Sequence, residues 1–204
     1  MTAQDELKTL VSSDLQPLLK AHGFGKKGLT FYRRNPGNFG LVQLQKSRYS
    51  TSSEVTFTIN VGVFSDHLQR ELGKIWWVPE VGKIPTEPSC HVRKRIGLLM
   101  PEANDVWWTV KSDAPSALGA ELCRVVQTYA LPFLDARATD EALRDRWIDD
   151  GTTGGISELQ LAVLLRDLGP RDRLEPLLTH LRATTPPRAT LLRSALDRFA
   201  ESLD

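Results

Sequence analysis

The most constraining feature of the sequence is the segment 54–64, EVTFTINVGVF, in which apolar and polar residues alternate. A β-strand turns successive side chains to opposite faces, so the alternation puts the apolar side chains on one face and Thr56, Thr58 and Asn60 on the other. Fully burying each of the five apolar side chains is worth about 1.5–3 kcal/mol, which predicts a strand in the middle of a sheet. The apolar positions are Val55, Phe57, Ile59, Val61 and Val63.

The segments that precede this strand predict an antiparallel meander. Residues 29–34 and 39–48 have the composition of strands, and the turn sequence Asn-Pro-Gly-Asn at 35–38 separates them. Residues 50–53 form a second turn that leads into the central strand. Three consecutive antiparallel strands are therefore expected.

The rest of the first 135 residues completes an α+β pattern. We expect a mainly antiparallel sheet of about five strands with helices on one face. The remaining predicted elements are strands at 90–99 and 106–111, a helix at 3–21 broken near Pro17, a helix at 66–74 capped by Ser65, and a helix from Asp113 and Pro115 to about residue 134.

The C-terminal third has a different character. Lysine is absent after Lys111, residues 151–155 form a glycine-rich joint, and leucine stripes predict four helices. We expect an α+β sheet domain at 1–135 followed by a helical C-terminal subdomain at 136–204. Ser157 and Gln160 have the spacing of a capping box. The predicted helices are 139–149, 157–168, 171–184 and 188–203.

Composition excludes several classes of protein. A net charge of +1 and 41% hydrophobic residues are ordinary for a globular protein. Cys90 and Cys123 lie far apart without C-x-x-C spacing, which argues against a disulfide framework and a zinc site. No secretory signal and no run of 18 apolar residues is visible, so we expect a cytoplasmic protein that does not interact with a membrane.

The motifs that resemble catalytic sites have the wrong context. Gly23, Gly25 and Gly28 match G-x-G-x-x-G, but they follow a helix and open a strand, whereas a phosphate loop needs the reverse order. Cys90 and His91 are neighbours on a predicted strand, so their side chains are expected to point to opposite faces. We therefore predict no catalytic residue, no metal and no cofactor.

A polar patch on the sheet is the strongest candidate site. The front of the chain is basic, and strand parity places His91, Arg93 and Arg95 on the face that carries Thr58 and Asn60. Arginine on such a face suits the recognition of carboxylates or phosphates, so a small anion is also a candidate ligand. The alternative is a set of solvated or mutually satisfied polar residues. The candidate partner-binding residues are Gln43, Gln45, Thr58, Asn60, His91, Arg93, Arg95 and Trp107.

Two doubled tryptophans add a second feature. On a strand, one of Trp107 and Trp108 must face the core and the other the opposite side. Trp76 and Trp77 open a long loop at 76–89 that is rich in proline and glycine. The tryptophans are either packed, or they form a stacking platform or an anchor for a protein partner.

Several short motifs occur together in the first part of the chain. They are His22-Gly23-Phe24, Lys26 to Gly28, Phe31 with Arg33, Gln45-Lys46-Ser47, Phe57-Thr58-Ile59-Asn60 with Gly62, Arg93 with Arg95-Ile96-Gly97, and Asp105 before Trp107-Trp108. In this combination the chain resembles a bacterial family, the domain-of-unknown-function family number 4304. The resemblance covers roughly residues 3–135, and the helical tail lies outside it. It implies an α+β domain and carries no established activity, cofactor or catalytic residue.

Three functions remain open from the sequence. The leading one is a non-enzymatic binding domain whose polar sheet face and Trp-rich loop dock a protein partner, as in a regulatory or immunity-type protein. The alternative is the binding of nucleic acid or another polyanion through the basic front half. A small-molecule enzyme that uses His91 and the arginines ranks third.

Overall fold

Strand β4 (Glu54–Ser65) is the centre of the sheet, as the alternating segment predicts. The computed structural model describes residues 2–112 and 117–203. One edge of β4 pairs from Phe57 to Ser65 with the whole of β3 (Asn38–Lys46). The other edge is shared, because β6 (Trp108–Lys111) pairs with its first residues and β5 (Val92–Arg95) with its later ones.

The described strands form one antiparallel sheet of six strands. The order is β1-β2-β3-β4-β5, with β6 beside β4. The meander of three consecutive strands is confirmed, and so is the α+β fold class. The meander begins with β2 (Thr30–Arg34), and β1 (Gly25–Lys27) extends the sheet beyond it.

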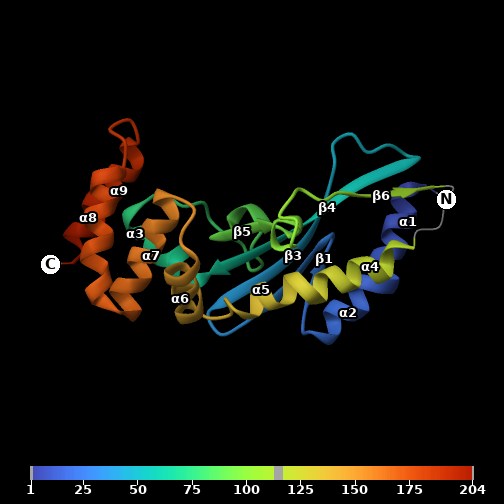
Figure 1. Cartoon of the computed structure of the whole chain (residues 1–204), viewed down its shortest axis with the longest axis horizontal. Coiled ribbons are helices and arrows are strands. Elements are labelled where there is room, and N and C mark those ends of the chain that lie inside the picture. Colours follow the sequence, from blue (N-terminus) through green and yellow to red (C-terminus); the bar gives the residue numbers. More distant parts are fainter. Residues whose placement is uncertain (1, 113–116, 204) are drawn as a thin grey trace.

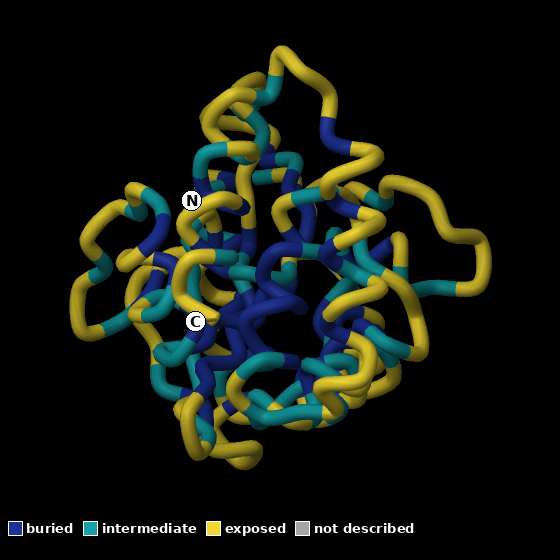
Figure 2. Tube along the Cα trace, turned by 90° about the vertical axis from the view of Figure 1, so that its left-hand side faces the viewer, coloured by how far each residue is buried: buried dark blue, intermediate teal, exposed yellow. Residues whose placement is uncertain are grey.

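Helices cover one face of this sheet. The five alternating apolar residues of β4 are at most 1% exposed and form the centre of the core. Viewed along the long axis, the buried residues gather in the middle and the exposed ones lie in peripheral loops (Figure 2). The covering helices are α1 (Ala3–Leu10), α2 (Gln16–Ala21), α4 (Leu118–Val125) and α5 (Leu131–Asp135).

Both covering helix pairs contain a wide π-turn before a proline. The turn Val11–Leu15 precedes Pro17, and the turn Val126–Ala130 precedes Pro132. Proline has no N–H to donate to the preceding turn, so the helix widens there instead of ending. The predicted break near Pro17 is therefore a π-turn. The predicted start of the second helix, at Asp113 and Pro115, lies outside the described residues.

The tail helices gather around α3 (Asp66–Ile75), which leaves the end of β4 (Figure 1). The Ser65 hydroxyl accepts from Leu68 N at 2.9 Å, so the predicted cap is confirmed. The apolar side of α3 packs on α7 and α9, and its residues belong to the same apolar cluster as the tail. The tail helices are α6 (Asp140–Asp150), α7 (Gly155–Leu168), α8 (Leu174–Thr184) and α9 (Thr190–Glu201).

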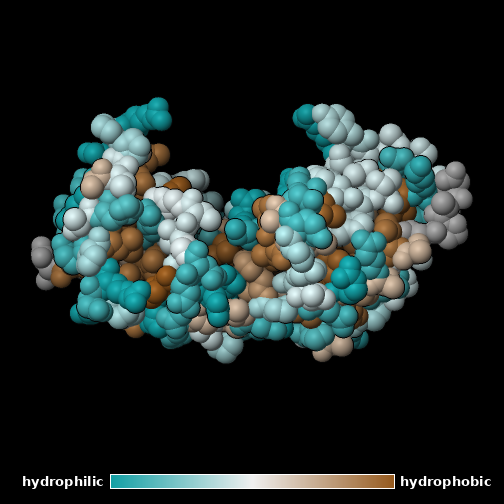
Figure 3. Space-filling view, in the orientation of Figure 1, coloured by the Kyte–Doolittle hydropathy of each residue, from teal (hydrophilic) through white to brown (hydrophobic). Residues whose placement is uncertain are grey.

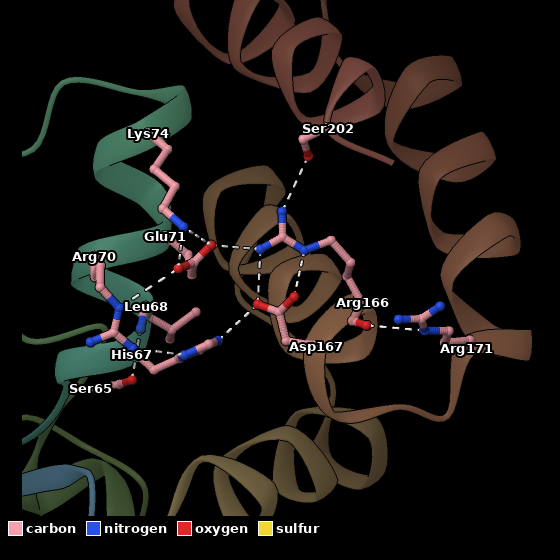
Figure 4. Close-up of polar contacts among 10 residues, drawn as sticks. All are labelled: Ser65, His67, Leu68, Arg70, Glu71, Lys74, Arg166, Asp167, Arg171 and Ser202. Atoms are coloured by element: carbon pink, nitrogen blue, oxygen red, sulfur yellow. Dashed lines mark hydrogen bonds and ion pairs between the residues drawn. The ribbon is translucent and has the colours of Figure 1, made fainter. Parts of the chain in front are cut away.

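A charged cluster ties α3 to the tail (Figure 4). Arg166 of α7 donates through Nη2 to Glu71 Oε2 at 2.8 Å and through Nε to Asp167 Oδ1 at 2.6 Å. His67 Nε2 lies 2.8 Å from Asp167 Oδ2, and Lys74 donates to Glu71 at 2.7 Å. Each carboxylate thus has partners from two elements, and the cluster holds α3 against α7.

Two strand predictions need correction. Residues 90–99 are not one strand, because β5 ends at Arg95 and a 3₁₀ turn, Ile96–Leu99, follows. A Cβ at Gly97 would lie 2.2 Å from the carbonyl oxygen of Asn104, so the chain folds back there more tightly than a strand allows. Strand β1 was not expected, because Gly25–Lys27 has no apolar alternation.

The molecule is elongated, with the two described ends of the chain at opposite tips (Figure 1). A broad notch runs along one long edge, between projections formed by the α8–α9 and β3–β4 connections (Figure 3). No helix within residues 2–112 and 117–203 combines the length and hydropathy needed to cross a bilayer.

Candidate functional site

A row of polar side chains crosses the sheet on the face opposite the covering helices. Directly opposed residues of antiparallel strands share a face, and the register opposes one residue of each strand to the next. The row is Lys27, Thr30, Gln43, Asn60 and Arg95, from β1 to β5. Gln43, Asn60 and Arg95 were predicted to lie together, and the structure places them side by side.

Amide side chains form the floor of this row. Asn60 is buried, and its Nδ2 donates to Gln45 Oε1 at 2.8 Å and to Gln43 Oε1 at 3.3 Å. The Nε2 groups of both glutamines have no hydrogen-bond partner among the described residues. The floor therefore presents spare N–H donors.

Arg93 stands at one side of the floor and is held by Glu87. Its Nε and Nη2 donate to the two carboxylate oxygens at 2.8 and 3.0 Å. The Glu87 side chain is 7% exposed, whereas that of Arg93 is 50% exposed. The carboxylate thus fixes the guanidinium in place and leaves its outer edge open to solvent.

Arg95 stands beside Arg93 and is held by Asp105 and Trp107. Its Nη1 donates to Asp105 Oδ2, and its guanidinium carbon lies 5.1 Å from the centre of the Trp107 ring. Trp107 Nε1 also donates to Asp105, at 3.0 Å. These hydrogen bonds, led by the one from Arg95, hold the pKa of Asp105 below its ordinary value. Trp107 is 36% exposed, whereas Trp108 is buried in the core, as parity requires.

Together these side chains surround a hollow of about 420 Å³. We call it the sheet-face hollow. Its surroundings are polar and predominantly basic, and the half-exposed Leu98 contributes an apolar contact. Its lining residues are Gln45, Asn60, Glu87, Arg93, Lys94, Arg95 and Leu98.

Thr58 does not line the hollow, although it was a candidate. Its hydroxyl donates to the carbonyl of Val106 at 2.8 Å, and the residue is fully buried. Thr58 therefore fastens the segment 96–107 across the sheet. A surface ligand has no access to it.

His91 lies on the same sheet face but belongs to a different site. Its ring packs 5.1 Å from that of Phe64, and its Nδ1 accepts from Ser65 N at 3.1 Å. Burial lowers the pKa of His91 to about 4, so the imidazole is neutral at pH 7. Beyond Asn60 the face is thus apolar, with a small cluster of Phe39, Leu41, Phe64 and Cys90.

This end of the face opens into a second cavity of about 360 Å³, which we call the apolar pocket. It lies between α3, the loop 76–90 and α7. Cys90 and His91 both line it, contrary to the expectation of opposite faces, because Cys90 precedes the strand and follows a 3₁₀ turn, Glu87–Ser89. Its lining residues are Gln69, Leu72, Trp76, Trp77, Val78, Pro79, Pro88, Ser89, Cys90, His91, Ile156, Leu159 and Gln160.

The thiol and the imidazole of this pocket do not form a nucleophile and base. Burial, with the charge of Glu87, raises the pKa of the Cys90 thiol, and the Nδ1 of His91 is occupied. Within the described ranges, no three His, Cys, Asp or Glu side chains are grouped closely enough to hold a metal ion.

Sequence reasoning missed Gln160. The helix α7 begins at Gly155, so Ser157 does not cap it and Gln160 lies beyond the first turn. The signal was present in the run LQLAVLL at 159–165, where one amide interrupts a helix that is otherwise apolar all round. Such a helix is buried on all sides, and its polar member needs a partner.

Comparison with known proteins identifies the sheet domain. Residues 15–136 match the family described as "Domain of unknown function (DUF4304)". The chain belongs to this family. No curated protein and no solved structure matches it.

The DUF4304 match contains all the residues that line one cavity but only some of those that line the other. It covers all six strands and α3, so the sheet-face hollow lies wholly within the DUF4304 domain. The apolar pocket lies partly outside it, because Ile156, Leu159 and Gln160 come from the tail. The tail therefore completes a cavity that the DUF4304 domain alone leaves open.

Proposed function

We propose that this protein is a non-enzymatic binding module of the regulatory or immunity type, which docks a protein partner over the sheet-face hollow. The Trp-rich loop 76–89 forms the neighbouring wall through Glu87. The partner surface is expected to be rich in carboxylates and carbonyl oxygens.

The fixed positions of the two arginines carry the proposal. Arg93 and Arg95 are each anchored by a carboxylate on one edge of the guanidinium. Nη1 of Arg93, and Nε and Nη2 of Arg95, have no hydrogen-bond partner among the described residues. Arginine and tryptophan are enriched among residues that dominate binding energy at interfaces. Pre-ordering them reduces the entropy lost on binding.

The distribution of the other basic residues favours a protein over a nucleic acid. Within 15–53 the sequence has no acidic residue and seven lysines and arginines. In space four of these seven contact a polar or acidic side chain that lies ten or more positions away in the sequence, and three of those partners come from outside the interval. Lys27 lies on the open face, whereas Lys46 is opposite Phe57 and so lies on the helix-covered side. A continuous basic stripe, the usual footprint of nucleic-acid binding, is not formed by these residues. The contacts are Lys26–Gln16, Arg33–Asp135, Arg34–Asp66 and Lys46–Gln4.

Site-specific photocrosslinking in the source cells tests the proposal. A benzoylphenylalanine at position 98 is expected to give a discrete protein adduct. Trp107→Ala, or the pair Arg95→Ala with Asp105→Asn, is expected to abolish it. The same crosslinker at Lys20, on the exposed side of α2, serves as the control. Adducts that persist in both variants would refute docking at the hollow, and a nucleic-acid adduct would favour the alternative.

A further inference from the structure

Gln160 has an unsatisfied side chain inside the apolar pocket. The residue is 7% exposed, and its Oε1 is buried without a hydrogen-bond partner. Its Nε2 makes no hydrogen bond within the described ranges either. A buried amide without partners destabilises a fold, so an explanation for keeping one here is required.

The same pocket contains a second unused polar group. Because the backbone N–H of Ser65 donates to Nδ1 of His91, the ring carries its proton on Nε2. That Nε2–H has no acceptor among the residues the structure describes. Two other polar side chains of the lining are occupied: Gln69 donates to the Pro79 carbonyl at 2.8 Å, and Ser89 Oγ donates to the Thr86 carbonyl at 2.7 Å.

The remaining lining determines what kind of molecule fits. None of the described residues that line the pocket carries a charge, and the walls are mostly apolar, with Trp76 and Trp77 among them. Trp77 is 80% exposed, so its indole is free to stack on a ligand. A cavity of about 360 Å³ is at the small end of the range for ligand pockets.

We propose that the apolar pocket binds a small, neutral aromatic or heteroaromatic molecule that carries an amide group. The amide pairs with the carboxamide of Gln160, whose buried oxygen turns into the pocket on binding, so that the side chain offers one donor and one acceptor side by side. The Nε2–H of His91 donates to a further acceptor on the ligand, and the ring packs against the tryptophans. This site is separate from the sheet-face hollow and does not depend on partner docking there.

The two cavities share one short element, which places the ligand next to the proposed docking surface. In the 3₁₀ turn Glu87–Ser89, Glu87 lines the hollow whereas Pro88 and Ser89 line the apolar pocket. His91 and Arg93 are two residues apart along the same chain. The apolar pocket therefore adjoins the wall of the hollow that holds Arg93.

A matched series of fragments tests the proposal on the full chain. Benzamide has a donor and an acceptor, acetophenone has an acceptor alone, and benzoate has a charge in place of the amide. We expect benzamide to bind with a dissociation constant of about 1 mM, a modest affinity that lies well below the ligand-efficiency ceiling for a fragment of this size. Benzoate is expected to bind at least about tenfold more weakly, because no cation lines the pocket. NMR shifts of the Trp76 and Trp77 indole N–H groups report the binding.

Gln160→Met separates a binding role from a structural one. Methionine fills the same space without polar atoms, so the variant is expected to melt about 2–4 °C higher than the natural chain. It is also expected to lose at least about tenfold in benzamide affinity while keeping its acetophenone affinity within about twofold. Gln127→Met, at an exposed glutamine of the π-turn Val126–Ala130, is the control and is expected to change neither quantity.

Three results would overturn the proposal. The first is no benzamide binding at 10 mM, and the second is unchanged benzamide binding in Gln160→Met. The third is tighter binding of N-acetylphenylalanine amide than of benzamide, which would assign the pocket to a segment of a partner polypeptide.

Discussion

Arg93 and Glu87 form a bidentate ion pair whose two members differ in burial, since the Glu87 side chain is 7% exposed and the Arg93 side chain is 50% exposed. Removing the arginine leaves a buried carboxylate without its two charged donors. Removing the glutamate leaves a cation that solvent can hydrate. The arginine is therefore both part of the proposed surface and a support for the loop beneath it.

Arg93→Ala is expected to destabilise the protein more than Arg95→Ala. Leaving the buried Glu87 carboxylate without its partner is expected to lower the free energy of unfolding by about 1–3 kcal/mol. Loss of the exposed Arg95–Asp105 pair is expected to lower it by only about 0.2–1 kcal/mol. Urea denaturation of both variants measures the difference. Adding Glu87→Gln to Arg93→Ala is expected to restore most of the stability. Equal costs for the two arginines would contradict this account.

Arg166→Met is expected to lower the free energy of unfolding by about 3 kcal/mol. The side chains of Arg166 and Glu71 are 17% and 11% exposed, and the substitution leaves both Glu71 and Asp167 short of a partner. Arg146→Met is the control, since its pair with Asp150 is 3.8 Å long and half-exposed on both sides. Denaturant titration is the measurement, and a loss within 1 kcal/mol for Arg166→Met would show that the cluster is dispensable.

Stability is expected to fall as the pH drops from about 6.5 to about 4. The pKa of His91 is lowered by burial from 6.5 to about 4, so in this window the unfolded chain binds the proton and the folded chain does not. Stability due to the neutral ring is therefore fully present above the unfolded pKa. It is lost progressively below that value, by about 3 kcal/mol at most.

His91→Asn isolates this effect. Its side-chain oxygen can still accept from Ser65 N, but it does not titrate. The difference in unfolding free energy between the two proteins, followed from pH 4 to 7, is expected to shrink as the pH falls. A difference that stays constant over this range would mean that His91 titrates normally in the fold.

Gly97→Ala is expected to destabilise the protein by about 1–3 kcal/mol, since the added carbon meets backbone atoms of Asn104 and Val106 that cannot turn away. Gly82→Ala is the matched control, because nothing lies within 4 Å of its added carbon. That control is expected to stay within about 0.5 kcal/mol. If Gly97→Ala melts like the natural protein, the 96–107 segment is looser than described.

We propose that residues 1–135 fold as a sheet domain and residues 136–204 as a separable helical subdomain. The family match ends at residue 136, next to this boundary. A chain that ends at Asp135 is expected to keep protected amides in β2, β3 and β4. Its helix α3 is expected to exchange rapidly, because Leu68, Leu72 and Ile75 lose α7 and α9 as partners. Hydrogen exchange measures both, and loss of protection in the strands would show that the two parts share one core.

The sequence predicts the sheet well where one face is buried. The alternation in β4 and the turn at 35–38 determine the meander, and parity correctly places Gln43, Asn60 and Arg95 on one face. Strand β1 is not predicted from the sequence, because its three residues include two exposed lysines and show no alternation of apolar and polar side chains. The early end of β5 depends on a close approach to Asn104, which no local pattern reveals.

The sites are less predictable than the fold. Glu87 lies in a loop without periodicity, so its pairing with Arg93 depends on tertiary contacts. Parity placed His91 on the correct face, yet Phe64 and Cys90 turn that end of the face into an apolar environment. Gln160 belongs to a helix about seventy residues further along the chain, and only packing brings it to the same cavity.

The shared edge of β4 has a consequence for how recognition can vary. Since β5 and β6 both pair with this edge, the segment between them is anchored at both ends, and Thr58 pins it once more through the Val106 carbonyl. Leu98, Asp105 and Trp107 all lie in the span between these anchors. If a partner docks here as proposed, substitutions at these three positions are expected to alter its contacts while the strands keep their register. The segment between β5 and β6 could then change in specificity without any change in the sheet.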